Sequence, residues 1–210
     1  MTPPYTFRMT TQRQALSTKA GRPLRADAER TVRTILEAAE RTLSRDPGAT
    51  MEQIAEAAGV ARTTVHRRFA TREALIDALA RWATRLFAEA VDAARPDTAP
   101  PLVALYQTTV NVLDMKVSWG FAMSRAVASG PEVERVHAEI AETCERLLRR
   151  AREAGLLRRD VDIRWARRAY YGLIHQADLH RTEDDDSATL ASLVVDTLLH
   201  GTGTPDADRL

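Results

Sequence analysis

Apolar residues recur along most of the chain at the three- and four-residue spacing of amphipathic helices. The first such stretch spans residues 26–44, where one face carries Val32, Ile35, Leu36, Ala39 and Leu43. Further stretches follow at residues 102–116, 119–128, 132–154, 163–181 and 187–200. No segment shows sustained alternation of β-branched residues, and neither Asn-Gly nor Asp-Gly occurs. The pattern predicts an all-α fold.

Proline, glycine and capping residues mark the ends of the predicted helices. None of the nine prolines falls inside a stretch with helical spacing. Between residues 50 and 94 we expect three more helices, at about 50–58, 62–69 and 71–94. Thr50 and Gln53 have capping-box spacing, Gly59 suits a helix end, and Thr71 suits a helix start. The expected total is about nine helices.

Composition places the chain among globular proteins of one or two domains. It has 210 residues, of which 44% are hydrophobic and 28% charged. No apolar run is long enough for a membrane helix, and the first 25 residues resemble no signal peptide. Cys144 is the sole cysteine, which excludes an internal disulfide and a cysteine-based zinc site. We therefore expect a cytoplasmic protein without membrane contact.

The formal net charge of +1 argues against a nucleic-acid binder until it is divided by position. Residues 1–25 carry five basic and no acidic groups, residues 26–75 carry eight of each, and residues 76–210 carry 17 basic and 21 acidic. Within the neutral segment, residues 62–72 hold four arginines and no acid. This distribution favours a DNA-binding head on a body that does not bind DNA.

Residues 50–75, TMEQIAEAAGVARTTVHRRFATREAL, combine a helix, a glycine-containing turn and a second short helix. So short a helix must be held by apolar packing, for which the candidates are Ile54, Ala58, Val60, Val65 and Phe69. Its outward positions carry side chains of the kind that contact base edges in the major groove, namely Arg62, Thr63, His66 and Arg67. A buried helical corner with a solvated arginine face has the same spacing, so the pattern alone leaves both interpretations open.

The segment EQIAEAAGVARTTVHRRFATREALIDAL resembles the DNA-binding domain of the TetR family of bacterial transcriptional regulators. That family has an amphipathic first helix, an IAxxAGV helix and turn, a recognition helix ending in Phe, and a K-E-x-L opening of the fourth helix. The resemblance is specific over residues 31–79 and looser beyond, where GLxH…D…LVVDTLLHG is also similar. Two positions depart from the pattern: His66 stands where Tyr is usual, and Arg72 where Lys is usual.

The resemblance implies a sequence-specific DNA-binding regulator, and repression is the family's usual mode. We expect contacts to base edges from Arg62, Thr63 and Arg67, because arginine can donate two hydrogen bonds to guanine and a threonine methyl can pack on thymine. Phosphate contacts are expected from Thr50, Thr64, His66, Arg68 and Arg72. The expected partner is double-stranded DNA with a palindromic operator, bound by a two-fold dimer.

Three parts of the chain follow from this organisation. Residues 1–25 are expected to form a flexible basic arm, which either contacts DNA or is an untethered tail. Residues 26–75 are the expected three-helix helix-turn-helix domain. Residues 76–210 are the expected helical domain for effector binding and dimerisation.

The last two long helices carry the expected homodimer interface. Their apolar faces suit a four-helix bundle between two chains, as the resemblance also implies. The candidate residues are Leu173, Ile174, Ala177, Leu190, Leu193, Val194, Thr197 and Leu198. The same stripes would also suit the core of a single chain.

The middle helices are rich in aromatic and polarisable residues. In the TetR family these helices enclose an effector cavity, and such a lining suits a small, mostly apolar ligand. The candidates are Trp82, Tyr106, Trp119, Met123, His137, Cys144, Tyr170, Tyr171 and His175. A ligand that favours mis-spaced recognition helices would release the DNA.

Other functions find less support in the sequence. The chain has no HExxH, GxSxG, P-loop or GxGxxG motif, so we expect no catalytic residue and no cofactor. His175 and His180 are five residues apart and do not share a helical face, which disfavours a metal site. The remaining alternative is a TetR-like protein that answers to a protein partner or lacks a functional effector pocket.

Overall fold

The computed structural model describes residues 21–126, 130–182 and 184–200. These residues form eight helices and no strand, which confirms the all-α prediction for this part of the chain. The helices are α1 (Gly21–Arg45), α2 (Met51–Ala57), α3 (Arg62–Arg68), α4 (Arg72–Ala93), α5 (Pro101–Ala126), α6 (Pro131–Glu153), α7 (Ile163–Leu179) and α8 (Ser187–His200). None of them is long and apolar enough to cross a membrane.

One expected break is present as a kink, and one expected helix start is wrong. The break expected between segments 102–116 and 119–128 is a kink within α5: Trp119 has non-helical backbone angles (φ −138°, ψ 31°), and two helical stretches meet there. Residues 127–128 of that prediction lie outside the described residues. The first helix starts at Gly21, so residues 21–25 of the expected arm belong to α1. Residues 1–20 of the arm also lie outside the described residues.

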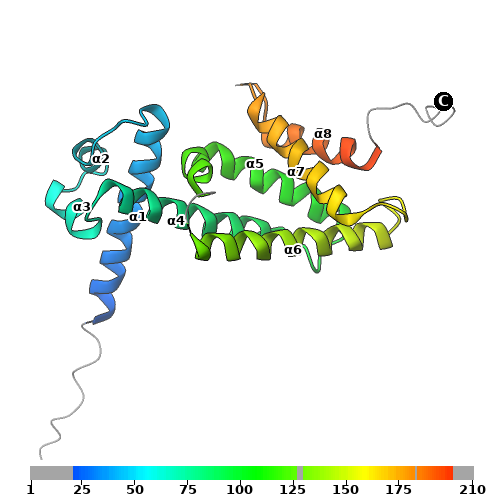
Figure 1. The fold of residues 1–210 in the computed structure, drawn as a ribbon, viewed down its shortest axis with the longest axis horizontal. Coiled ribbons are helices and arrows are strands. Elements are labelled where there is room, and N and C mark those ends of the chain that lie inside the picture. The colour runs from blue at the N-terminus through cyan, green and yellow to red at the C-terminus, as the bar shows by residue number, and fades with distance from the viewer. Residues whose placement is uncertain (1–20, 127–129, 183, 201–210) are drawn as a thin grey trace, which may run out of the picture.

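The first four helices enclose a small core at one end of the molecule (Figure 1). The apolar face of α1 is buried from Ile35 to Leu43, both at 0% exposure, and half-buried at Val32. α2 and α3 have only seven residues each, too few to be stable alone. They are held by Ile54 and Val65, each at 0% exposure, and by the buried Phe69. We call α1 to α3 with the start of α4 the head.

The remaining helices pack around a second and larger core, which we call the body (Figure 1). Its centre is Tyr170 of α7, which is 1% exposed. The Tyr170 hydroxyl lies 2.7 Å from the Thr109 hydroxyl and donates to the Leu105 carbonyl of α5 at 3.3 Å. These bonds satisfy a polar group that would otherwise be costly to bury.

α4 and α5 belong to both cores. α4 runs from the head into the body, so that Leu75 and Leu79 pack in the first core and Val91 in the second (Figure 1). α5 lies in the body, but its residues Met115 and Ala122 pack against the head. A movement of either helix would therefore change the packing of both the head and the body.

Candidate functional site

α2 and α3 form the helix-turn-helix that the sequence predicts. Thr50 caps α2: its hydroxyl accepts from the Gln53 backbone N–H at 3.3 Å, and the Gln53 side chain accepts from the Thr50 N–H at 2.7 Å. Gly59 then adopts the left-handed φ of +65°, which lets the chain turn directly into α3. Thr71 caps α4 by accepting from the Ala74 N–H at 3.1 Å.

The outward face of α3 gathers most of the predicted DNA contacts. Arg62, Thr63, His66, Arg67 and Arg68 are exposed, whereas Thr64 is half-buried. Thr50, at the start of α2, is also exposed. Because Val65 and Phe69 anchor the opposite side of α3, these polar side chains are held on a surface open to a large partner.

The cations of this face differ in what they contact. Arg62 Nη2 lies 2.6 Å from Glu52 Oε1, and His66 Nε2 lies 3.9 Å from the same oxygen. The pKa of Glu52 is lowered by the backbone N–H at the start of α2 and further by Arg62. Arg67 and Arg68 make no ion pair with any residue that the structure describes. Their charges are therefore open to phosphate groups.

Arg72 makes contacts within the head that the sequence did not predict. Its Nε donates to the Ala49 carbonyl at 3.2 Å, and its Nη2 donates to the Pro47 carbonyl. The side chain is half-buried and ties the start of α4 to the loop between α1 and α2. Two of the five guanidinium donors thus bind backbone carbonyls, which gives Arg72 a structural role in the head, while its predicted phosphate contact stays a prediction.

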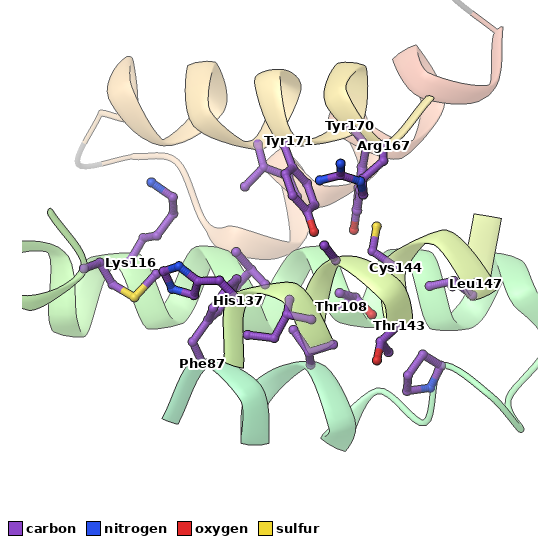
Figure 2. Close-up of a pocket in the computed structure, with 17 residues that line it drawn as sticks. Phe87, Thr108, Lys116, His137, Thr143, Cys144, Leu147, Arg167, Tyr170 and Tyr171 are labelled. Atoms are coloured by element: carbon purple, nitrogen blue, oxygen red, sulfur yellow. The ribbon is translucent and has the colours of Figure 1, made fainter. Parts of the chain in front are cut away.

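The body contains a cavity of about 390 Å³ between α4, α5, α6 and α7 (Figure 2). Most of its wall is apolar, as in Phe87, Val112 and Ile140. The full lining is Phe87, Val91, Pro96, Thr108, Val112, Lys116, Met123, His137, Ile140, Ala141, Thr143, Cys144, Leu147, Arg167, Tyr170, Tyr171 and Ile174. This volume and lining are typical of sites for small molecules.

Burial favours the uncharged form of several polar groups of the cavity wall. Burial raises the pKa of the Cys144 thiol to about 12 and also raises the pKa of the Tyr171 hydroxyl. Burial lowers the pKa of His137, which favours the uncharged imidazole. The buried hydroxyl of Thr108 has no hydrogen-bond partner among the described residues.

Comparison with known proteins identifies the fold. Residues 35–79 match the sequence profile of "Bacterial regulatory proteins, tetR family". The chain is 33% identical over 157 residues to the HTH-type transcriptional repressor LfrR of Mycolicibacterium smegmatis, covering 74% of this chain and 81% of LfrR. The chain belongs to the TetR family. The resemblance found in the sequence is thereby confirmed.

Solved structures of TetR-like proteins agree with this assignment. LfrR from Mycobacterium smegmatis in complex with proflavine has a TM-score of 0.70 at 28% identity, over 85% of this chain and 99% of that one. FadR from Bacillus subtilis in complex with stearoyl-CoA shares the fold with a TM-score of 0.63 at 18% identity, over 81% and 98%. TetR-family proteins are DNA-binding regulators, which fits the exposed face of α3.

The predicted pocket residues of this TetR-family chain fall into two groups. Met123, His137, Cys144, Tyr170 and Tyr171 line the cavity. The other four do not, which corrects the prediction for Trp82, Tyr106, Trp119 and His175. Tyr106 packs on the large core from its edge, and His175 is exposed.

Trp82 and Trp119 line a second cavity of about 410 Å³ between α1, α4 and α5. There the guanidinium carbons of Arg33 and Arg85 lie 5.5 and 5.6 Å from the Trp82 ring centroid. The two tryptophans therefore lie at the junction of head and body and not in the cavity of the body.

The sequence prediction missed the polar residues of the cavity, above all Arg167, Thr108 and Lys116. It selected aromatic and sulfur-containing side chains, and these three were passed over as ordinary polar positions. A signal was present: Thr108, Val112 and Lys116 recur every four residues on one face of α5, and Arg167 precedes Tyr171 by four on α7. A prediction that included the polar residues at helical spacing along these faces would have found them.

The predicted dimer residues of α7 and α8 are covered to different degrees. Ile174, Leu190 and Val194 are buried in the core of one chain, which corrects the prediction that they form the dimer surface. Leu173, Ala177, Thr197 and Leu198 are half-buried. Leu193 is 62% exposed, as are Trp165 at 64% and Leu179 at 61%. Large apolar side chains thus remain uncovered on both helices.

A buried carboxylate joins the head to the body. Glu40 of α1 is 3% exposed, and its two oxygens accept from the Phe121 and Ala122 backbone N–H groups, each at 2.9 Å. Both donors follow directly after the bend of α5 at Trp119. Burial raises the pKa of Glu40, against the lowering effect of these hydrogen bonds. Met123, which follows Ala122 in the chain, lines the cavity of the body.

Proposed function

We propose that the chain is a ligand-responsive repressor that binds a palindromic operator as a homodimer and leaves it when a small amphipathic molecule fills the cavity of the body. The observation that carries this proposal is the double role of α5. One helix lines the cavity through Thr108, Val112, Lys116 and Met123, and also receives Glu40 of the head. Occupation of the cavity can therefore act on the orientation of the head.

The exposed face of α3 is the proposed operator-reading surface. Arg62, Thr63 and Arg67 are proposed for base edges, and Thr50, Thr64, His66 and Arg68 for phosphates. In support, all of these side chains except Thr64 are exposed, and Arg67 and Arg68 lie outside the ion pairs formed by the described residues. Arg62 would exchange its contact with Glu52 for one with guanine.

Dimerisation through α7 and α8 is proposed to bring two heads onto one operator. Uncovered apolar side chains on both helices, namely Trp165, Leu179 and Leu193, support an apolar partner surface. The residues beyond the head, 76–210, would then form the dimerisation and effector domain. The sequence division at residue 75 is part of this proposal, although the core of the head also includes Met115 and Ala122.

The proposal predicts that ligand and operator bind with opposing free energies. A ligand that binds better to the form with mis-spaced heads must weaken operator binding by the same factor by which the operator weakens ligand binding. The name of LfrR, a transcriptional repressor, and its structure with proflavine support this mode of action for the present chain.

The experiment is selection of DNA from a random pool with the purified full-length protein, followed by fluorescence anisotropy with the enriched duplex. We expect an enriched palindrome bound by two chains. Thr108→Val, a substitution of similar shape inside the cavity, should keep operator affinity. Absence of any enriched palindrome would contradict the proposal and favour a protein-controlled interaction module.

A further inference from the structure

The wall of the effector cavity carries positive but no negative side chains. Of its lining residues, Lys116 and Arg167 are cationic, and none is an aspartate or a glutamate. Figure 2 places Lys116 with His137 at one end, and Arg167 with Tyr171 and Cys144 at the other. His137 and Cys144 are held in their uncharged forms by burial, so the two cations decide the electrostatics of the cavity.

The charge of Lys116 is already balanced. Its Nζ lies 2.7 Å from Asp178 Oδ2, and both side chains are largely covered, with 22% and 26% exposure. This end of the cavity is therefore close to neutral.

Arg167 is balanced only in part. Its Nε donates to Glu145 Oε1 at 3.2 Å, while the other oxygen of Glu145 accepts from Arg149 Nη2 at 2.9 Å. One carboxylate thus serves two guanidinium groups, which leaves about one positive charge uncompensated. Only Arg167 of these three residues lines the cavity.

The Arg167 side chain is also held in place before any ligand arrives. Its guanidinium carbon lies 5.3 Å from the centroid of the Tyr171 ring, and the bond to Glu145 fixes Nε. A hydrogen bond from Arg167 to the Tyr171 hydroxyl also acts on the pKa of that tyrosine, against the raising effect of burial. A guanidinium that is oriented in advance and partly buried is a strong donor to a carboxylate.

We propose that the effector is an amphipathic organic anion, with its anionic group at Arg167 and its apolar part against Phe87, Val112 and Ile140. A cation is disfavoured, because the cavity offers no carboxylate to replace its lost hydration. This inference rests on the proposed ligand response, since it names the class of ligand that acts at the same site.

The experiment measures binding of two pairs of probes to the full-length protein by isothermal titration calorimetry. The first pair is decanoate and decylammonium, with decan-1-ol as the neutral member of the same chain length. The second pair is anthracene-2-carboxylate and proflavine, a planar cation. We expect the anion of at least one pair to bind about tenfold or more tightly than its cation.

Variants of Arg167 and of its partner Glu145 test whether the preference for anions arises at this arginine. Arg167→Gln should weaken the anion about tenfold and leave decan-1-ol within about threefold, whereas Glu145→Gln should tighten the anion. Arg167→Lys, which keeps the charge, should retain part of the preference if Arg167→Gln folds poorly. The matched control is Arg135→Gln, which removes an exposed arginine paired with Glu139 on the same helix, and should change nothing.

Cation binding equal to or tighter than anion binding, or no binding by either anion, would overturn the inference. So would equal effects of the Arg167→Gln and Arg135→Gln variants. Operator release separates this inference from the proposed function. If an anion binds through Arg167 but leaves the operator complex intact, the ligand response fails and the anion preference stands. If a cation releases the operator, the ligand response stands and the anion preference fails.

Discussion

The four arginines between residues 62 and 72 differ in what their guanidinium groups contact. Arg62 pairs with Glu52, Arg67 and Arg68 extend from α3, and Arg72 donates to two carbonyls of the loop before α2. Composition and spacing correctly predicted that this segment is cationic. They could not separate these roles, since the Ala49 and Pro47 carbonyls that Arg72 contacts are more than 20 residues away in sequence.

The stabilising role of Arg72 is testable by substitution. Arg72→Ala should lower the free energy of unfolding by about 1–3 kcal/mol, because the Ala49 and Pro47 carbonyls lose a charged donor. Chemical denaturation followed by circular dichroism measures this, with Arg68→Ala as the control on the exposed face of α3. Equal stability of the two variants would refute the structural role.

At the scale of the element, α5 determines how head and body meet. The sequence predicted two helices here, and the structure has a kink at Trp119 between two helical stretches of α5. Backbone N–H groups after the kink donate to Glu40 on α1. The residues in this contact are about eighty positions apart in sequence, so no local sequence pattern predicts it. Apolar periodicity predicts helices well, but it does not locate the buried carboxylate of Glu40, which connects α1 to α5.

Glu40 should make the stability of the fold depend on pH. Its pKa is raised in the folded chain, so ionisation disfavours the fold, and its contribution to stability is lost as pH rises through the folded pKa. Glu40→Gln cannot ionise and keeps an acceptor for one of the two N–H groups. Take the free energy of unfolding of Glu40→Gln minus that of the unsubstituted chain. This difference should therefore increase as the pH rises from below the usual glutamate pKa to neutrality. Denaturation curves at both ends of this range measure the difference, and a difference that shrinks with rising pH would contradict the assignment.

At the scale of the whole molecule, the two cores separate the head from the body, and the cavity lies in the body. The sequence predicted the helix-turn-helix, the all-α class and five of the cavity residues. It could not tell which apolar stripe of α7 and α8 covers the core and which is left outside. Ile174 and Leu193 look alike in sequence, yet one is buried and the other is 62% exposed. Periodicity defines a face, whereas coverage of that face depends on how the helices pack together.

The exposed part of α8 should mediate dimerisation. Leu193→Glu places a charge on the proposed apolar interface and should shift the protein toward the monomer, since an unpaired charge in an apolar contact is costly. Val103→Glu on α5, where the side chain is 56% exposed, is the matched control and should leave the dimer intact. Size-exclusion chromatography with light scattering measures both. Loss of the dimer in the control alone would place the interface elsewhere.

The central claim is that the exposed face of α3 recognises a specific DNA sequence. It is tested most directly by titrating the unsubstituted protein and Arg62→Ala against the selected operator and its single-base variants. We predict that Arg62→Ala loses about 1–3 kcal/mol on the selected operator and loses discrimination at one position of each half-site. A uniform loss of affinity across all variants would make Arg62 a phosphate contact, and unchanged binding would contradict the account of α3.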